Sequence, residues 1–348
     1  MTAHINAIGT AVPDQDIHQA FIGWARAQLR DPRQAKLFDR MAQRSGITHR
    51  WSVLPQVTGS PVDPEGFYAD SWPTTAQRMG IYSRAAPDLA AQAVEALAAK
   101  LSLDGITHLV LASCTGFTAP GVDQILAQRI GLSASVERLL VGYMGCYAAV
   151  AALRSARHIV RSQADARVLV VCVELSTLHL QADSELEPLL AMLQFGDGAA
   201  AALVTSDASG LAIGQPFSTN LPASGDLIRW DLGDHGFAMH LSGEVPGAIG
   251  AALADPAMLP VAPETVDSWA VHAGGRSILD AVTHALHLSD DALNNSRAVL
   301  DANGNMSSAT LMFVLARILE GPPPAQGLAL AFGPGLAAEG FPFTGVQP

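Results

Sequence analysis

Charged side chains are scarce in this sequence. Asp, Glu, Lys and Arg make up 15% of its 348 residues, whereas hydrophobic residues make up 49%. A chain with this balance folds around a large core rather than staying disordered. The formal net charge is −12 and no run of basic residues occurs. A nucleic-acid partner is therefore not expected, and any anionic ligand must be held by a few local cations.

Cysteine is also scarce, with only Cys114, Cys146 and Cys172. An odd number of cysteines without metal-ligand spacing predicts neither a disulfide framework nor a metal site. No apolar run of about 18 residues is present, so no membrane-spanning helix is expected. The first residues show no charged segment followed by a long apolar run, so no signal peptide is expected. Together these absences predict a cytoplasmic protein.

Apolar runs alternate with helical segments along most of the chain, a pattern typical of α/β layering. Residues 168–173 and 198–204 are apolar without alternation, which predicts strands in a sheet buried on both faces. The chain is longer than the length at which one core usually stops growing, and its composition shifts near residues 206–216. We therefore predict two α/β halves, residues 1–208 and 209–348, that form a duplicated unit.

Some further elements are expected from local patterns. One helical region is expected over residues 19–44, and a surface loop over residues 54–75. A helix is expected over residues 85–100, with Pro87 in its first turn. Residues 327–332 are expected to form the last strand of the chain.

The segment VGYMGCYAAV, residues 141–150, is followed by apolar residues that recur every three or four positions, as on one face of a helix. Gly145 permits a sharp turn, which places Cys146 at or near the N-terminus of that helix. The unpaired amides and the helix dipole favour a thiolate there, and a cysteine pKa of about 3.5–7.5 is typical of such places. Cys146 is therefore a candidate nucleophile, although a small buried core cysteine has the same appearance in the sequence.

Two more residues have a similar setting. His272 closes the apolar strand SWAVH, and Asn305 lies in GNMSS among turn-forming residues. A thiolate needs a cationic or donating partner, and a thioester carbonyl needs donors that polarise its oxygen. A histidine and an asparagine directed at one oxygen also stabilise the enolate that forms when a malonyl group loses carbon dioxide. Each residue taken alone is more often structural, and spacing does not show that the three converge.

Six short motifs follow one another along the chain: SCTGFTAPGVD, GYMGCYAA, FGDGAAA, VHAGGRSILD, GNMSSAT and FGPGL. In this order they resemble the type III polyketide synthases, relatives of chalcone synthase within the thiolase-like superfamily. The resemblance covers most of the chain from about Phe38 onward. It implies a thiolase-like αβαβα layered fold with duplicated halves, the first carrying the nucleophilic cysteine and the second the histidine and asparagine.

The resemblance also implies an acyltransferase that condenses an acyl-CoA starter with malonyl-CoA on a cysteine thioester and then cyclises the product. Cys146 would carry the acyl group, His272 would be the thiolate partner, and Asn305 would be a second donor to the thioester carbonyl. Phe195 matches the family's gatekeeper phenylalanine between the coenzyme A tunnel and the cavity. The second gatekeeper position falls on Met239, a departure that leaves a softer opening.

Arg40 and Arg44 lie one helical turn apart and match basic positions that the family uses on coenzyme A phosphates. A loop that lines the coenzyme A tunnel aligns with three residues: Gly274, Gly275 and Ser277. The family loop that reaches the partner's cavity across the dimer corresponds to residues 118–120, which include Ala119. The resemblance thus implies a homodimer that acts on coenzyme A thioesters and needs no other cofactor.

The starter unit is the least determined feature. Bacterial members of this family often take fatty acyl starters and make alkylpyrones or alkylresorcinols. Met239 and Met144 are flexible and small alanines follow Cys146, which suits a medium or long alkyl chain that gains about 0.8 kcal/mol per buried methylene. Trp230 falls where plant relatives carry a cavity-wall glycine, and its bulk would favour a short starter. We predict the medium-to-long starter, and the sequence leaves delivery by an acyl carrier protein open.

Two other interpretations remain open at the level of sequence. One is an initiating ketoacyl synthase, which is also thiolase-like but carries its asparagine in a different motif and takes malonyl from a carrier protein. The other is a catalytically silent relative that acts as a binding protein. GNMSSAT and CTGFTAPGVD favour the polyketide synthase over the first. The intact set of Cys146, His272 and Asn305 argues against the second.

Overall fold

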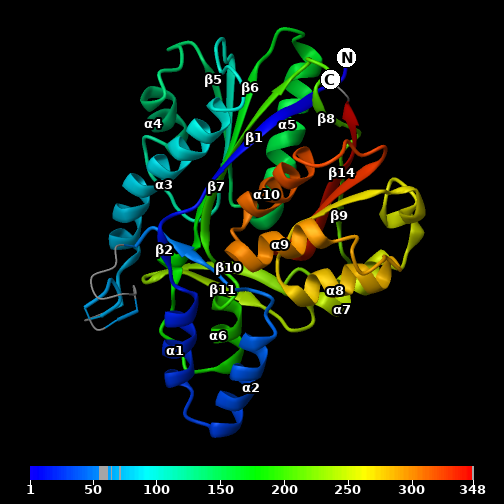
Figure 1. Ribbon diagram of the computed structural model, residues 1–348. Coiled ribbons are helices and arrows are strands. Elements are labelled where there is room, and N and C mark those ends of the chain that lie inside the picture. The colour runs from blue at the N-terminus through cyan, green and yellow to red at the C-terminus, as the bar shows by residue number, and fades with distance from the viewer. Residues whose placement is uncertain (55–61, 64, 70–71, 347–348) are drawn as a thin grey trace.

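The computed structural model describes residues 1–54, 62–63, 65–69 and 72–346. A ten-stranded mixed sheet runs through the molecule in the order β12-β13-β14-β8-β1-β7-β6-β4-β5, with β9 paired to β14 (Figure 1). Its strands are β1 (His4–Ala11), β4 (His108–Ser113), β5 (Glu137–Gly142), β6 (Val168–Leu175), β7 (Asp197–Thr205), β8 (Gly210–Ile213), β9 (Phe217–Asn220), β12 (Ser268–Val271), β13 (Gly327–Gly333) and β14 (Ala337–Val346).

The short strand β8 joins the sheets of the two halves. It pairs antiparallel with β1 on one side, where Ala212 faces His4, and with β14 on the other, where Ile213 faces Phe343. Two small ribbons lie outside this sheet: β2 (Gln15–Asp16) with β3 (Trp51–Ser52), and β10 (Ile228–Gly233) with β11 (Gly236–Leu241). Strands of both halves therefore belong to one hydrogen-bonded network.

Side chains along the buried strands alternate between a central core and two outer cores. Val170 on β6 and Ala329 on β13 face the central core, whereas Val171 and Leu330 face different outer cores. Two helices, α5 (Ala148–Ser162) and α10 (Ser308–Leu319), fill the central core between the two parts of the sheet. Their inward residues are mostly alanine, valine and leucine, so helices and strands approach closely. The predicted sheet buried on both faces is confirmed.

The remaining helices cover the outer faces (Figure 1). The first half carries α3 (Thr75–Ala98) and α4 (Val122–Arg129), and the second half carries α7 (Val245–Leu253), α8 (Arg276–Ala285) and α9 (Asn294–Asn303). Three helices, α1 (His18–Gln28), α2 (Pro32–Gln43) and α6 (Leu186–Met192), project together at the lower end of the molecule in Figure 1. The alternation of outer helix, sheet, inner helices, sheet and outer helix is the predicted layered α/β architecture.

Several local predictions were wrong. The helix expected to begin at residue 85 begins at Thr75, because Thr74 and Gln77 form a capping box there, and Pro87 lies inside the helix rather than in its first turn. The region 19–44 forms two helices that are separated before Pro32. Residues 327–332 are not the last strand, since β14 follows despite its glycines and its proline, held by pairing on both sides. Much of the loop predicted over residues 54–75 lies outside the described residues.

Candidate active site

Cys146 lies in a single 3-10 turn, Gly145–Tyr147, between β5 and α5. The φ angle of Gly145 is 67°, which is the left-handed region, and a Cβ on this residue would collide with the ring of Pro334. Only glycine satisfies both conditions, so this residue fixes the direction in which the turn presents its cysteine. Cys146 is 7% exposed. The predicted position of the cysteine, at a glycine turn just before a helix, is confirmed.

His272 directly follows β12 and continues its pairing, since its backbone N–H donates to the Leu330 carbonyl at 2.8 Å. The side chain is 2% exposed, and neither ring nitrogen has a hydrogen-bond partner among the described residues. A buried imidazole is normally hydrogen-bonded, because an unpaired buried donor or acceptor costs free energy. An orphaned imidazole beside a cavity is therefore a mark of a functional group.

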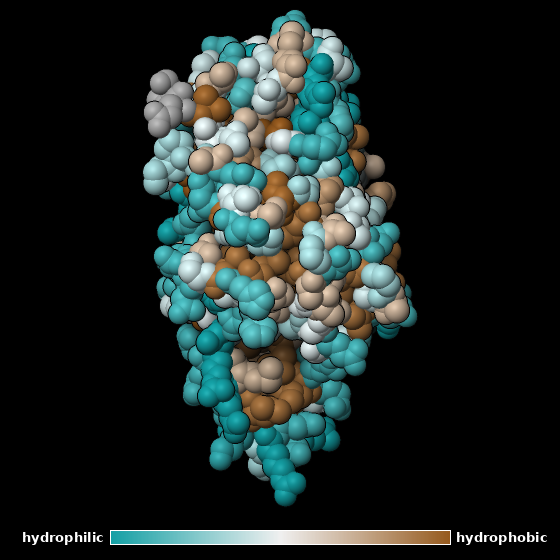
Figure 2. Space-filling view, turned by 90° about the vertical axis from the view of Figure 1, so that its right-hand side faces the viewer, coloured by the Kyte–Doolittle hydropathy of each residue, from teal (hydrophilic) through white to brown (hydrophobic). Residues whose placement is uncertain are grey.

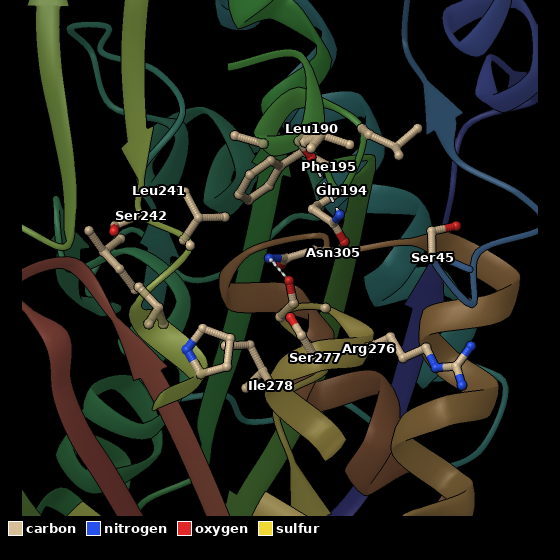
Figure 3. Close-up of a pocket in the computed structure, with 18 of the residues that line it drawn as sticks. Ser45, Leu190, Gln194, Phe195, Leu241, Ser242, Arg276, Ser277, Ile278 and Asn305 are labelled. Carbon is tan, nitrogen blue, oxygen red and sulfur yellow. Dashed lines mark hydrogen bonds between the residues drawn. The ribbon is translucent and has the colours of Figure 1, made fainter. Parts of the chain in front are cut away.

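Asn305 lies between α9 and α10 and is clamped by its backbone, since its N–H donates to the Gln194 carbonyl at 2.8 Å. Its Oδ1 accepts the Ser307 N–H at 2.8 Å, which orients the amide. Its Nδ2 donates to the Gly274 carbonyl at 3.2 Å and lies 4.0 Å from Cys146 Sγ. Figure 3 shows this amide directed across the pocket from the loop before α10. The two amide donors of Asn305 are thus directed at the Gly274 carbonyl and at the thiol sulfur of Cys146.

The three residues line one cavity of about 710 Å³, although they come from both halves of the chain. The same cavity takes in most of the other residues singled out in the sequence: Arg40, Arg44, Phe195, Met239, Gly274, Gly275 and Ser277. Each half contributes a polar residue just before its central helix, Cys146 before α5 and Asn305 before α10. Folding thus brings together three residues whose spacing along the sequence did not show that they converge.

A second cavity of about 240 Å³ adjoins the first and shares Phe195 and Met239 with it. Trp230 belongs to this second cavity, where its ring lies 6.2 Å from that of Phe195 and 6.4 Å from that of Phe237 between ring centroids. Trp230 and Met239 face each other across the β10–β11 ribbon. Phe195, Met239 and Trp230 therefore separate an outer chamber with the cysteine from an inner chamber.

Two predicted substrate-binding residues lie elsewhere. Met144 packs against the central core and lines neither of these cavities. Its position two residues before Cys146 had suggested otherwise, but the 3-10 turn directs the two side chains apart. Ala119 is exposed on a surface loop and also lines neither cavity of this single chain.

Burial changes the expected ionisation of the cysteine. The pKa of the Cys146 thiol is raised to about 11, mainly because a thiolate would lose hydration, while the Ser307 hydroxyl and Asn305 lower it in part. The expectation of a depressed pKa at this helix terminus is therefore wrong. A rise from 9 to about 11 is worth about 3 kcal/mol, which exceeds the stabilisation of up to about 2 kcal/mol that a helix terminus provides.

His272 shows the complementary effect. Burial lowers its pKa to about 3, because a buried imidazolium would be poorly hydrated. At neutral pH the histidine is therefore neutral and the thiol carries its proton. With both groups neutral, no ion pair is buried at rest, whereas a thiolate–imidazolium pair would hold two charges in the core.

Two residues beside the candidate site were not singled out from the sequence. Ser307 has a φ of 47°, unusual for a residue with a side chain, and it lies two residues after Asn305. Glu174 is fully buried behind the site and accepts bonds from Ser308 Oγ at 2.5 Å, Thr115 Oγ1 at 2.8 Å and the Cys114 N–H at 2.9 Å. Burial raises the pKa of Glu174 to about 7. In the sequence, Ser307 could have been noticed from the doubled serine in GNMSS, and Glu174 as the single acid in an apolar strand.

The entrance of the first cavity is formed by α2 and α8. Arg40 and Arg44 lie on α2 and at its end, and both are exposed. Figure 3 shows Arg276 and Ser277 at the start of α8 on the same pocket. On the face that carries α7 and α8, Figure 2 shows a hollow with hydrophobic residues inside it and hydrophilic residues around it. An anionic group at the entrance and an apolar group inside would both meet suitable partners.

Among the described residues, no group of three or more His, Cys, Asp or Glu side chains could hold a metal ion. In the same part of the chain, none of the helices is both long and apolar enough to cross a membrane.

Comparison with known proteins agrees with this geometry. The N-terminal domain of chalcone and stilbene synthases matches residues 1–208, and the C-terminal domain of the same enzymes matches residues 213–347. The chain belongs to the chalcone and stilbene synthase family. It is thus an enzyme of the polyketide synthase type, as the motifs had implied.

Individual relatives support the same assignment. The alpha-pyrone synthesis polyketide synthase-like Pks18 of Mycobacterium tuberculosis is 31% identical over 98% of this chain and 91% of its own length. The type III polyketide synthase domain of Steely1 from Dictyostelium has a TM-score of 0.89 with 27% identity, covering all of both chains. A polyketide synthase from the brown alga Ectocarpus siliculosus has a TM-score of 0.87 with 28% identity, covering 99% of this chain and 98% of that one. The predicted thiolase-like fold is confirmed.

Proposed function

We propose that this type III polyketide synthase loads a medium- or long-chain fatty acyl group from coenzyme A onto Cys146. It then extends the chain with malonyl-CoA by decarboxylative Claisen condensation and cyclises it to an alkylpyrone or alkylresorcinol. The observation that carries this proposal is the convergence of Cys146, His272 and Asn305, from residues 1–208 and 209–348, on one cavity. The relative named for alpha-pyrone synthesis favours the pyrone.

Loading begins with a proton transfer. Because the thiol of Cys146 and the imidazole of His272 are both neutral at rest, His272 accepts the thiol proton as the sulfur attacks the starter's thioester carbonyl. The amide hydrogen of Asn305 that is directed at the thiol at rest turns to the oxyanion of the tetrahedral intermediate and stabilises it. The bond to the coenzyme A sulfur then breaks, and the departing thiolate takes the proton from His272. The acyl group is left on Cys146 as a thioester.

Extension uses the same donors on a different carbonyl. The malonyl thioester oxygen accepts hydrogen bonds from Asn305 Nδ2 and from the N–H of His272, so the carboxylate leaves as carbon dioxide and its bonding electrons form an enolate. The enolate carbon attacks the acyl carbonyl on Cys146 and the cysteine sulfur leaves, which joins the two chains. Decarboxylation itself generates the carbanion, so these steps need no cofactor beyond the coenzyme A thioesters.

The inner chamber fits the alkyl end of the starter. At about 30 Å³ per water-sized group, its volume of about 240 Å³ holds about eight such groups. Its walls include Phe21, Leu180 and Phe237, so each methylene placed there gains about 0.8 kcal/mol. The chamber begins behind Phe195 and Met239, which places the alkyl end beyond the thioester. These features favour a medium-length alkyl chain over an acetyl starter.

A second copy of the chain is part of this proposal. Strand β5 is the edge of the sheet and pairs only with β4 among the described strands. Leu139 and Leu140 on this strand are 44% and 50% exposed, and Tyr143 after it is 69% exposed. An exposed apolar sheet edge is a site where another chain pairs or packs. The loop with Ala119 follows β4, the strand that pairs with β5, and would reach the partner from there.

A series of starters tests the chain-length proposal. With malonyl-CoA as extender, kcat/KM should rise from acetyl-CoA towards octanoyl- and decanoyl-CoA, and mass spectrometry should find the acyl group on Cys146. Ala191 lines both cavities, so Ala191→Leu should lower kcat/KM for decanoyl-CoA while leaving that for acetyl-CoA nearly unchanged. A flat or falling series would contradict the fatty acyl starter. Absence of any adduct on Cys146 would instead indicate a silent binding protein.

A further inference from the structure

Basic residues are concentrated in one short segment of this acidic protein. Six of the 20 Lys and Arg residues lie within residues 26–44: Arg26, Arg30, Arg33, Lys36, Arg40 and Arg44. The segment contains two acids, Asp31 and Asp39, so its net charge is 6 − 2 = +4, in a chain whose net charge is −12. All six cations are exposed. The segment comprises the end of α1, the turn and α2, which project from the body in Figure 1.

The two acids do not neutralise α2. Asp31 caps the helix by accepting the Arg33 backbone N–H, and Asp39 pairs with Arg26 of α1 at 2.9 Å. Within the part of the chain that the structure describes, the side chains of the remaining α2 cations form no ion pair: Arg33, Lys36, Arg40 and Arg44. Successive members are three, four and four residues apart, so they form one stripe along the helix. This stripe is the basic stripe of α2.

The basic stripe extends beyond the cavity. Arg40 and Arg44 line the entrance, where the phosphates of coenzyme A would lie, but Arg33 and Lys36 do not line it. Arg33 precedes Arg40 by seven residues, which is about 10 Å along the helix. A bound coenzyme A thioester therefore accounts for half of the stripe. The outer half, Arg33 and Lys36, does not line the cavity and offers its cations to a larger anionic partner.

We propose that the basic stripe of α2 docks an acidic acyl carrier protein, which presents the starter acyl group on a phosphopantetheine arm. This inference rests on the proposed function, because it concerns how the same site receives its starter. The arm is chemically the same as that of coenzyme A, so the same entrance admits it. A carrier protein lacks the nucleotide, and contacts with Arg33 and Lys36 replace the contacts that the nucleotide would make.

Charge and position favour a carrier protein. An acidic carrier is repelled by the molecule as a whole, but screening limits that repulsion to about 8–10 Å at physiological salt, so the local stripe dominates at contact. Leu37 and Met41, which are 40% and 44% exposed, lie between the cations and offer apolar contacts on the same helix. The stripe begins at the cavity entrance, where a carrier must sit to pass its arm inward. Binding to a membrane surface would not require the stripe to begin at the cavity entrance.

The test compares one acyl group in two forms, octanoyl-CoA and octanoyl loaded on a bacterial acyl carrier protein, with malonyl-CoA as extender. Arg33→Glu combined with Lys36→Glu reverses the outer half of the stripe. The matched control, Arg161→Glu with Arg317→Glu, changes the net charge by the same −4. Both control residues are exposed in the last turns of α5 and α10. These two residues lie about 14–20 Å along their helices from the active-site ends.

The Arg33/Lys36 variant should raise KM for the octanoyl carrier at least about ten-fold and change KM for octanoyl-CoA less than about two-fold, while the control changes neither. Equal changes for both starters, or turnover of octanoyl-CoA with none of the octanoyl carrier by the unaltered enzyme, would overturn the docking proposal. Failure with both starters would overturn the proposed function instead. Binding to phosphatidylglycerol vesicles that the variant loses, with unchanged carrier kinetics, would assign the stripe to a membrane and also overturn it.

Discussion

At the scale of single residues, the proposed reaction depends on Cys146 as the residue that holds the acyl group. Neither Cys114 nor Cys172 lines the first cavity, so neither can replace it. Cys146→Ala should abolish chain extension, as measured by product formation from octanoyl- and malonyl-CoA. Extension by this variant at the rate of the unaltered enzyme would show that another residue carries the chain.

Replacing the same cysteine with glutamine separates the two half-reactions. Cys146→Gln carries an amide that resembles the acylated cysteine, so the variant should still decarboxylate malonyl-CoA with the help of His272 and Asn305. Release of carbon dioxide is the measurement. The matched control adds Asn305→Ala to this background and should reduce the release at least about ten-fold. Equal release from both would contradict the role of Asn305 at the enolate oxygen.

The protonation state of His272 has a consequence for stability. Its pKa is about 3 in the fold and about 6.5 when unfolded, so below pH 6.5 the unfolded chain binds a proton that the folded chain does not. Stability is therefore lost as the pH falls. At pH 5 this one group should cost about 2 kcal/mol. His272→Gln removes the effect.

Denaturant unfolding at pH 7.5 and pH 5 measures this contribution of His272 to the free energy of unfolding. Relative to the unaltered protein, His272→Gln should gain about 2 kcal/mol in unfolding free energy between pH 7.5 and pH 5. Glu174 and Asp197, whose pKa values burial raises to about 7, act in the opposite direction but are present in both proteins and cancel in the difference. A thiolate–imidazolium pair at rest would raise the pKa of His272 instead. The gain would then be absent, which would contradict the neutral pair.

At the scale of elements, the proposed binding of coenzyme A depends on α2. Arg40 and Arg44 are exposed at the entrance, and within the described residues neither forms an ion pair that phosphate would have to displace. Arg40→Ala with Arg44→Ala should raise KM for octanoyl-CoA about ten-fold, equivalent to about 1.4 kcal/mol, with little change in kcat. Contacts with the distant phosphates hold the ground state and the transition state equally.

An N-acetylcysteamine thioester is the matching control substrate, because it has the reactive end of coenzyme A but no phosphate. Its kinetics should be the same in the double variant and the unaltered enzyme. If kcat/KM falls to the same extent for both substrates, the arginines support the fold of the entrance and do not bind the phosphates. If neither changes, the phosphates bind elsewhere.

At the scale of the whole molecule, the proposed homodimer depends on the apolar edge at β5. Sedimentation at micromolar concentration should show a dimer, and Leu140→Glu should shift it towards the monomer, because a buried charge at an apolar interface is costly. Leu37→Glu is the control, since Leu37 is similarly exposed but lies on α2, at the other end of the molecule in Figure 1. A monomeric unaltered enzyme would contradict the proposal.

The local sequence was sufficient for the layered α/β class, for most central strands and for the turn at Cys146. Apolar runs, glycine turns and helix periodicity depend on neighbours within a few residues, so a pattern reveals them. Prediction from local pattern failed where residues distant in the sequence determine the structure of an element. Strand β14 holds its glycines and Pro342 in place only because β13 and β8 pair with it, and α3 begins at a cap that apolar periodicity does not mark.

Motif order alone indicated the polyketide synthase family, and the residues themselves named Cys146, His272 and Asn305 as candidates. Only the tertiary structure decided that these side chains line one cavity, because β12, α5 and α10 come from distant parts of the chain and converge through packing of the two halves. It also reversed the expected ionisation of Cys146, since burial depends on the whole core whereas a helix terminus is a local feature. The same holds for Trp230 and Met144, whose places were set by the ribbon β10–β11 and by the 3-10 turn.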